Sequence, residues 1–251
     1  MRSRNPFFEK LFGGRKLPRR RGRCEKIYPC SKHTSTIAGG NPMYTVFLAG
    51  GIASGKSSVA RARERRGAWR IDLDQLSRAV LEPGSECVDE VAAAFGDDLV
   101  DTCTGALDRG ALARRAFADA ESTARLEAIE LPYIRRMLVR MLEGEGCCQT
   151  NPRVCVVEVP LLDRMEPMLN LADEVLVVDC PLEVRRVRAQ GRGMDVADFD
   201  RRAALQPSDE YLREHATTIL DNSGGPSDLA ARVDEWWASR EAARWKEARN
   251  G

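Results

Sequence analysis

Residues 50–57 read Gly-Gly-Ile-Ala-Ser-Gly-Lys-Ser and match the phosphate-loop pattern G-x-x-x-x-G-K-[ST]. An apolar run, Tyr44–Ala49, precedes the segment and a helical pattern follows it, as the pattern requires. In this context backbone amides and the helix N-terminus face phosphate oxygens, Lys56 reaches the β- and γ-phosphates, and Ser57 ligates Mg²⁺. The segment predicts a nucleoside triphosphate site; the alternative is a glycine-rich turn with a merely solvated lysine. The candidate ligand-binding residues are Gly50, Gly51, Ile52, Ala53, Ser54, Gly55, Lys56, Ser57 and Ser58.

Short apolar runs alternate with longer helical patterns from Met43 onward, which is typical of a parallel sheet covered by helices. The runs expected to form strands are Tyr44–Ala49, Ala68–Ile71, Val154–Val159, Val175–Val178 and Thr217–Leu220. A helical stretch, Val88–Leu142, lies between the second and third of these, and we expect a substrate-binding subdomain at about residues 88–142. The segment Leu229–Arg249 fits a closing amphipathic helix, whose tryptophans we interpret as packing anchors.

Charge divides the chain into a basic extension and an acidic body. Residues 1–42 contain 11 of the 39 Lys/Arg residues and 2 of the 38 Asp/Glu residues, so the extension has a net charge of +9. The remainder of the chain has a net charge of −8. The extension has no sustained periodicity of apolar residues, so we expect it to be disordered. An alternative is that Met43 is the true translation start and that the extension is not part of the protein. An organellar transit peptide is a further alternative. Residues 43–251 are expected to form one enzyme domain, since their length suffices for one full core.

Composition excludes several classes of protein. An acidic body offers no electrostatic footprint for specific nucleic-acid binding. No apolar run approaches the roughly 20 residues that a membrane-spanning helix needs, and no signal peptide is apparent. The eight cysteines show no regular framework, which indicates reduced thiols and a cytoplasmic protein. We expect a monomer or a small homo-oligomer.

Carboxylates follow two of the expected strands, where open α/β sheets place their ligands. Asp72 and Asp74 come directly after the second strand, and Glu158 lies near the end of the third. Asp74 is the candidate base for an acceptor hydroxyl, with Asp72 in support. Glu158 is placed to meet a Mg²⁺-bound water. The alternatives are helix capping by either aspartate and a buried, hydrogen-bonded Glu158.

Four arginines lie between Glu183 and Arg192, and a cationic helix face of this kind can hold transferring phosphoryl oxygens. Arg188 and Arg192 are four residues apart, which predicts one helical face. Gly191 and Gly193 bracket Arg192 and suggest a hinge or lid tip. Solvated surface arginines are the alternative interpretation.

Taken together, these motifs resemble the dephospho-CoA kinases, and the resemblance covers almost all of residues 43–226. It rests on the phosphate loop, on Asp72-Leu73-Asp74, and on a series of further ordered matches. Those matches are Glu82-Pro83-Gly84, Leu107-Asp108-Arg109 with Leu112 and Phe117, Pro160-Leu161-Leu162, Val177-Val178-Asp179, Arg188 with Arg192, Gln206, and Asp221-Asn222-Ser223-Gly224.

The resemblance implies an α/β fold of the nucleotide-kinase kind, a three-layer sandwich with a five-stranded parallel sheet, a helical substrate-binding insertion and a lid at about residues 183–212. It implies ATP and Mg²⁺ as cofactors, dephospho-CoA as acceptor, and transfer of the γ-phosphoryl group to the ribose 3′-hydroxyl. Asp74, Lys56 and Arg188 are then catalytic, and Arg192 is a second lid residue. On the substrate side the resemblance implies Asp74, Arg109, Pro160 and Leu161, and for the metal Ser57 and Glu158.

Four positions depart from the usual family pattern: Leu131 replaces a common His, Ala49 a Thr, Ala53 a Gly and Arg164 a Glu. We expect Ala53 to stiffen the phosphate loop slightly, because alanine lacks the backbone freedom of glycine. Leu131 casts doubt on substrate contacts nearby. Two other functions stay open at this point: a P-loop kinase with a different small acceptor, and a noncatalytic nucleotide-binding regulator that uses the basic extension.

Overall fold

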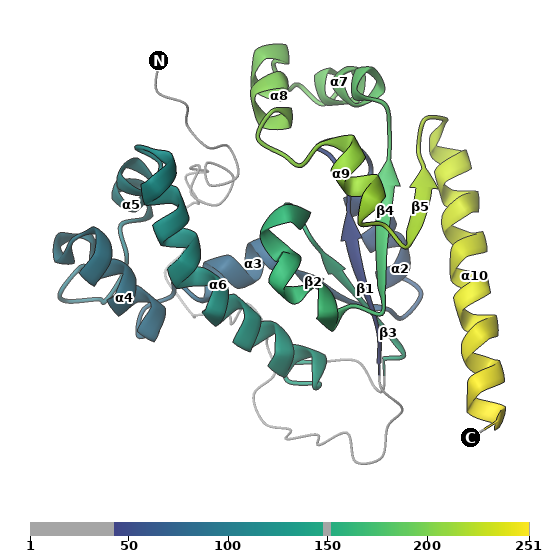
Figure 1. The fold of residues 1–251 in the computed structure, drawn as a ribbon, viewed down its shortest axis with the longest axis horizontal. Helices are drawn as coiled ribbons and strands as arrows, with labels where there is room; N and C mark the ends of the chain where they lie inside the picture. Colours follow the sequence, from purple (N-terminus) through teal and green to yellow (C-terminus); the bar gives the residue numbers. More distant parts are fainter. Residues whose placement is uncertain (1–42, 148–151, 251) are drawn as a thin grey trace, which may run out of the picture. The chain divides into compact units, whose positions relative to one another are not determined.

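The computed structural model describes residues 43–147 and 152–250 (Figure 1). The expectations for residues 1–42, a disordered extension or a misplaced start, lie outside the described residues. No helix in the described part of the chain is long and apolar enough to cross a membrane.

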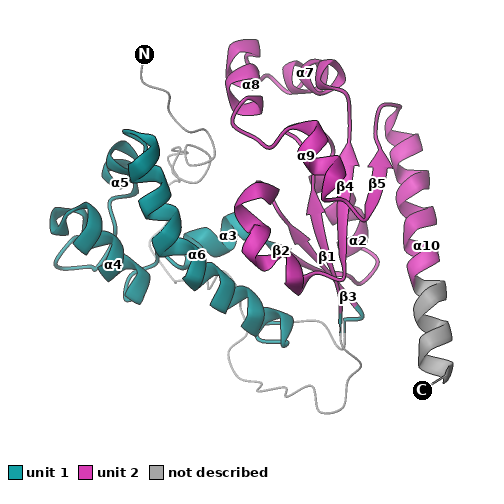
Figure 2. Ribbon diagram, in the orientation of Figure 1, with its two compact units in different colours: residues 1–43, 72–153 teal, residues 44–71, 154–251 magenta. Residues whose placement is uncertain are grey.

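The chain divides into two compact units, coloured separately in Figure 2. Residues 44–71 and 154–251 form the α/β unit. Residues 72–153, together with Met43, form the helical unit, which the sequence inserts between the two parts of the first. The stretch predicted as a substrate subdomain, residues 88–142, falls inside the helical unit, and its binding role stays a prediction.

A five-stranded sheet forms the centre of the α/β unit, in the order β2-β3-β1-β4-β5. Strand β1 pairs in parallel with β3 and β4, and β4 with β5. The parallel sheet predicted from the sequence is confirmed, with strand ends shifted by one residue at most positions. The strands are β1 (Tyr44–Ala49), β2 (Trp69–Asp72), β3 (Val154–Glu158), β4 (Glu174–Asp179) and β5 (Thr218–Asp221).

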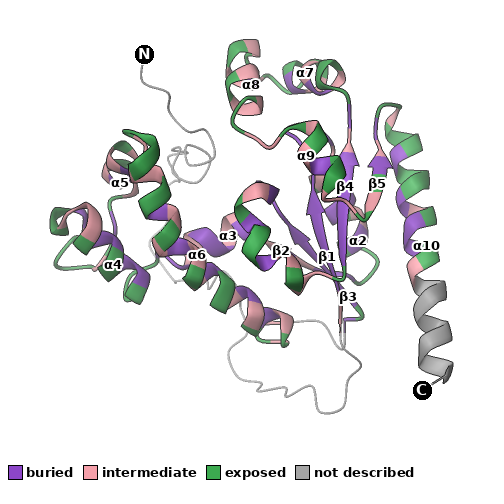
Figure 3. Ribbon diagram, in the orientation of Figure 1, coloured by how far each residue is buried: buried purple, intermediate pink, exposed green. Residues whose placement is uncertain are grey.

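Helices cover both faces of this sheet, so its three central strands, β1, β3 and β4, are buried on both sides (Figure 3). On one face, alternate strand residues such as Val46, Leu176 and Leu220 pack against α2 (Lys56–Glu64) and α10 (Pro226–Asn250). Trp236 and Trp237 of α10 are buried there, as the packing interpretation predicted. On the other face η2 (Leu162–Leu171) contacts β1 and α9 (Asp209–Glu214) contacts β4. The chain also forms α7 (Leu182–Gln190) and α8 (Val196–Ala203) between β4 and α9.

The helical unit is built on the 23-residue helix α6, which contacts three other helices of the unit. Side chains at helical spacing on α6, among them Leu126, Ile134 and Leu138, are buried in its core. Ser85 and Asp119 cap the N-termini of α4 and α6 with side-chain hydrogen bonds. The elements of this unit are α3 (Leu73–Ala79), α4 (Glu86–Phe95), η1 (Asp97–Leu99), α5 (Arg109–Ala116) and α6 (Ala120–Leu142).

Candidate active site

The phosphate loop connects β1, the central strand of the sheet, to α2. Gly55 has φ +110°, in the left-handed region, and a Cβ there would lie 2.5 Å from Asn222 Nδ2. A Cβ on Gly51 would lie 1.8 Å from Arg185 Nη1. Glycine is therefore required at both positions for neighbouring side chains to reach the loop. Ala53 has φ +60°, which costs an alanine on the order of 1 kcal/mol, so this departure from the family pattern strains the loop as well as stiffening it.

Side chains from the second half of the chain hold the loop in place. Asn222 Nδ2 donates to the Ser54 carbonyl at 2.6 Å, and the Ile52 amide donates to Gln206 Oε1. Arg185, which is 4% exposed, lies against Gly51, and its Nη2 donates to both carboxylate oxygens of Asp209, at 2.7 and 2.8 Å. The two family matches at Gln206 and Asn222 thus contact the loop backbone directly.

Ser54 supplies an observation that favours a phosphate ligand. Its hydroxyl oxygen is buried and has no hydrogen-bond partner among the described residues. A buried polar group without a partner is costly, so such a group calls for an explanation such as a ligand. The hydroxyl lies within the loop whose backbone amides the motif directs at phosphate oxygens. The residues present therefore fit a bound triphosphate.

Lys56 and Ser57, a predicted metal ligand, are the first two residues of α2. Lys56 Nζ donates to the carbonyls of Gly50 and Gly51, the second at 3.1 Å. Ser57 Oγ lies 3.2 Å from Glu158 Oε2, so the two residues predicted to serve the metal are brought together. A hydroxyl and a carboxylate are hard oxygen donors of the kind that Mg²⁺ prefers. Ser58 lies beside them in the first turn of α2, where its amide donates to the Gly55 carbonyl at 2.9 Å.

Glu158 has a second partner that the sequence did not reveal. Arg70, on β2, forms an ion pair with Glu158 Oε1. The carboxylate is therefore both buried and hydrogen-bonded, which was one of its two predicted interpretations. The other interpretation is compatible, because Glu158 Oε2 still faces Ser57.

The arginines of the predicted lid do not share one helical face. Helix α7 ends at Gln190, so Arg192 lies beyond the helix, and the prediction of a common face with Arg188 was wrong. The chain turns there instead, through Gly191 and then Gly193, whose φ is +81°. Arg188 donates to the Gly224 carbonyl at 2.7 Å and to Cys180 Sγ at 3.3 Å. Arg192 is exposed.

Two further arginines of the run have different surroundings. Arg186 pairs with Glu183 and Asp200 at 2.7 and 2.8 Å and is largely structural. Arg185 is the one that contacts the phosphate loop, and no sequence pattern distinguishes it from the neighbouring arginines. Its burial depends on Gly51 and Asp209, which are distant along the chain.

Asp72 and Asp74 have distinct positions in the helical unit. Asp72 is the N-cap of α3, and its Oδ1 accepts from the Asp74 amide at 3.0 Å. The capping alternative therefore holds for Asp72. Asp74 lies in the first turn of α3 and is half-buried, and its role as a base stays a prediction.

Arg109 begins α5 and ties that helix to the segment after α3. Its Nη2 donates to the Arg78 carbonyl at 3.0 Å and pairs with Glu82 at 2.9 Å. The Arg78 carbonyl also accepts from the Leu81 amide at 3.3 Å, so Arg109 adds a second donor at the C-terminal end of α3. Arg109 therefore contacts the C-terminal end of α3, whereas Asp74 lies in the first turn of the same helix.

The remaining predicted substrate residues, Pro160 and Leu161, follow β3 directly, and Leu161 is buried at the start of η2. Among the departures from the family pattern, Arg164 pairs with Asp163 at 3.4 Å and Ala49 is fully buried at the end of β1. Leu131 is half-buried on α6.

Glu130, the residue before Leu131, is buried in the helical unit and was not singled out by the sequence. It is 3% exposed, and Ser77 Oγ donates to its Oε2 at 3.4 Å. Burial raises the pKa of its carboxyl to about 8, against the opposing effect of the Ser77 hydrogen bond. Its spacing was a usable signal, because it lies four residues after Leu126 and four before Ile134, both in the apolar stripe of α6.

Comparison with known proteins agrees with this geometry. The family model for dephospho-CoA kinase matches residues 44–228. A dephospho-CoA kinase of Frankia casuarinae is 41% identical over 203 residues, covering 80% of this chain and 86% of its own length. The enzyme of Corynebacterium diphtheriae is 42% identical over 197 residues, covering 78% and 96%.

Solved structures agree on the fold. Protein TT1252 of Thermus thermophilus is similar with a TM-score of 0.65 and 30% identity, over 79% of this chain and 98% of that one. The dephospho-CoA kinase of Campylobacter jejuni has a TM-score of 0.59 at 21% identity, over 80% and 98%. With a phosphate loop, a paired Ser57 and Glu158, and relatives of this identity, the chain belongs to the dephospho-CoA kinase family.

Proposed function

We propose that this protein phosphorylates dephospho-CoA, transferring the γ-phosphoryl group of ATP to the ribose 3′-hydroxyl to give CoA and ADP. The observation that carries the proposal is the phosphate loop with its buried, unpartnered Ser54 hydroxyl, in a chain 41% identical to a dephospho-CoA kinase. The α/β unit then binds ATP, residues 88–142 bind the acceptor, and residues 183–212 act as the lid. We place the enzyme in the cytoplasm, as a monomer or small homo-oligomer.

The reaction forms one bond and breaks one. The acceptor 3′-oxygen bonds to the γ-phosphorus, the bond from that phosphorus to the bridging oxygen breaks, and ADP leaves with the electron pair. Asp74 accepts the hydroxyl proton, while Lys56 binds the β- and γ-phosphates. Ser57 and Glu158 would hold a Mg²⁺ ion, which would supply positive charge that offsets the phosphate oxygens of ATP.

Other residues position the two substrates. Arg188 and Arg192 neutralise phosphate charge from the lid, and lid closure excludes water so that ATP is not hydrolysed. Arg109, Pro160 and Leu161 contact the acceptor. Arg185 is a positioning residue: its support for Gly51 keeps the loop in the conformation that binds phosphate.

Replacing Asp74 tests the mechanism. Asp74→Asn removes the proton acceptor with little change of shape, so we expect kcat to fall by about 10²–10⁴-fold while ATP affinity is retained. Coupled ADP release measures the first quantity and titration calorimetry the second. Asp72→Asn is the matched control, because asparagine caps helices as well as aspartate does and turnover should persist. Normal turnover by Asp74→Asn contradicts the assigned base.

Acceptor choice tests the substrate. The protein is offered ATP, Mg²⁺ and, separately, dephospho-CoA, adenosine, AMP or shikimate, and CoA is identified by mass. Turnover with dephospho-CoA supports the proposal. Turnover only with another acceptor retains a P-loop kinase but rejects this substrate, and ATP binding without any turnover favours a regulator.

A further inference from the structure

One buried, ionisable side chain of the helical unit has no part in the proposed reaction. Glu130 is 3% exposed and lies in the apolar stripe of α6, between Leu126 and Ile134. Ser77 Oγ, on α3, donates to its Oε2 at 3.4 Å, and its Oε1 has no hydrogen-bond partner among the described residues. Burying a carboxyl with so few partners is costly, so its presence in an apolar stripe calls for an explanation beyond packing.

The donor to Glu130 lies on the helix that carries the candidate base. Helix α3 has 7 residues, fewer than the roughly 12–15 that an isolated helix needs in water, so contacts from outside must hold it in place. Asp74 and Ser77 are three residues apart on α3, which makes them neighbours along one side of the helix. A shift of Ser77 therefore moves Asp74 as well.

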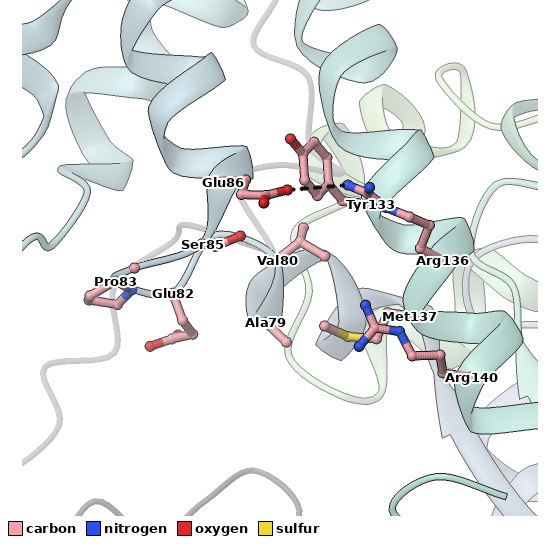
Figure 4. A pocket seen from close by; sticks show the side chains of 11 residues that line it. Ala79, Val80, Glu82, Pro83, Ser85, Glu86, Tyr133, Arg136, Met137 and Arg140 are labelled. Carbon is pink, nitrogen blue, oxygen red and sulfur yellow. Dashed lines mark ion pairs between the residues drawn. The ribbon is translucent and has the colours of Figure 1, made fainter.

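The C-terminal end of α3 receives less support from α6. Ala79, the last residue of α3, borders a cavity of about 570 Å³ that Met137 of α6 lines as well (Figure 4). A cavity supplies no atoms for a helix to pack against, so it does not fix this end of α3. Ser77 is buried and makes its hydrogen bond to Glu130 one helical turn from Asp74. The contact between Ser77 and Glu130 is thus well placed to hold the base.

Titratable groups on neighbouring elements act on the Glu130 carboxyl. Glu127, on the same helix, disfavours its ionisation, whereas Arg109, at the start of α5, favours it. Cys87 of α4 interacts with Glu130, and burial raises the pKa of the Cys87 thiol to about 12, so the thiol is uncharged at neutral pH. Burial is the largest influence on Glu130 and raises its pKa to about 8. At neutral pH its carboxyl is therefore mainly protonated.

We propose that Glu130 is a positioning residue for the reaction, because its carboxyl ties α3, and with it Asp74, to α6 through Ser77. The inference rests on the proposed function, in which Asp74 accepts the proton of the acceptor hydroxyl. Ionisation of Glu130 puts a charge into an apolar site where no described residue donates to Oε1 and Glu127 repels the charge. Water must then enter the contact, which loosens α3 and displaces Asp74. Turnover consequently declines as the pH rises through the pKa of Glu130.

The pH dependence of kcat for the full-length chain tests the inference. For the unmodified chain we expect kcat near pH 9 to be roughly tenfold lower than near pH 7, since displacing a catalytic group by about 1 Å can cost about 10²-fold. Glu130→Gln keeps the shape of the side chain but cannot ionise, so its kcat should stay level over this range. Glu121→Gln is the matched control, because Glu121 is exposed on the same helix and the decline should persist.

Ser77→Ala is a second variant, whose effect appears at neutral pH. It removes the hydroxyl that joins α3 to Glu130, so we expect kcat near pH 7 to fall about threefold. KM for ATP should not change, because the proposed ATP site lies in the α/β unit. A decline of equal size in Glu130→Gln and Glu121→Gln, or a level pH profile for the unmodified chain, overturns the inference.

Amide hydrogen exchange separates the inference from the proposed function. After correction for the intrinsic rate of exchange, α3 of the unmodified chain should exchange faster near pH 9 than near pH 7, and α3 of Glu130→Gln should exchange equally at both. This measurement reports how firmly Glu130 holds α3 and needs no turnover. Absence of CoA formation by the unmodified chain rejects the proposed function, whereas pH-independent exchange of α3 in that chain rejects the role of Glu130.

Discussion

Each of the two units holds one glutamate that is no more than 3% exposed, Glu174 in the α/β unit and Glu130 in the helical unit, and the surroundings of these two side chains are opposite. Glu174, at the start of β4 in the α/β unit, is 2% exposed and surrounded by donors. Arg240 contributes two hydrogen bonds at 2.8 Å, and Trp236 Nε1 and Tyr44 each contribute one at 2.9 Å; Thr218 also donates. Burial alone raises the pKa of this carboxyl, but the hydrogen bonds outweigh burial and lower it to about 2.

Glu130, in the helical unit, is buried to the same extent with much less support. Ser77 donates to its Oε2 at 3.4 Å, and its Oε1 has no hydrogen-bond partner among the described residues. Burial, with a smaller contribution from the nearby charge of Glu127, raises its pKa to about 8. The number of hydrogen-bond donors around a buried carboxyl therefore decides whether it is charged at neutral pH.

The two residues consequently affect stability in different pH ranges. Glu174 has a lowered pKa in the folded state, so its contribution is present above its ordinary pKa and is lost as pH falls from about 4.5 to about 2. Glu130 has a raised pKa, so its contribution is present below about 4.5 and is lost as pH rises to about 8.

Neutralising Glu174 should have the largest effect on stability. Glu174→Gln leaves Arg240 and the other donors around an uncharged amide, so we expect a loss of about 3 kcal/mol in the free energy of unfolding at pH 7. Urea denaturation measures it. Glu166→Gln, on the more exposed η2, is the control, and we expect it to lose less stability. An equal loss for both variants would contradict the strong stabilisation of the Glu174 carboxylate.

The same substitution in the helical unit should act in the opposite direction. Glu130→Gln removes a carboxyl that resists ionisation, so we expect the variant to be more stable than the parent by about 2 kcal/mol at pH 8. Near pH 4 the difference should vanish, because the carboxyl is then protonated in both folded and unfolded chains. Thermal unfolding across this range measures it, and a pH-independent difference contradicts the raised pKa.

Removing one hydrogen-bond donor from each glutamate should give the smallest losses of stability. The two losses compare how much hydrogen bonding stabilises Glu174 and Glu130. Thr218→Ala removes a hydrogen bond to a charged carboxylate, so we expect a loss of about 1.5 kcal/mol. Ser77→Ala removes a long hydrogen bond to a neutral carboxyl, so the loss should be about 0.5 kcal/mol. Both losses of stability are measured by urea unfolding at pH 7. A larger loss for Ser77→Ala than for Thr218→Ala would show that hydrogen bonding supports Glu130 more strongly than it supports Glu174.

The sequence predicted the sheet and the phosphate loop well because both are encoded locally. Tyr44–Ala49 is a mainly apolar run, and the loop that follows needs glycine at fixed positions. The end of α7 was not predicted, because the Arg188–Arg192 spacing suggests a helix that the turn after Gln190 interrupts.

Long-range contacts account for what the sequence did not reveal. Nothing adjacent to Arg185 indicates that it meets Gly51 and Asp209, and nothing adjacent to Glu158 indicates Arg70. These pairings exist only once the sheet has brought distant segments together. The motifs therefore named the loop and two of the side chains that hold it, Gln206 and Asn222, but they did not name Arg185 or Arg70.

The insertion of one unit within the other has a consequence for synthesis on the ribosome. Strand β1 pairs with partners that come much later, since Tyr44 is matched with Val154, 110 residues downstream. The helical unit is one uninterrupted stretch, residues 72–153, and closes its contacts over shorter separations. Since long-range strand pairing is slow and must await its partners, we expect the nascent chain to organise the inserted helices first. The nucleotide loop, although encoded near the start, is then among the last parts to acquire its final shape.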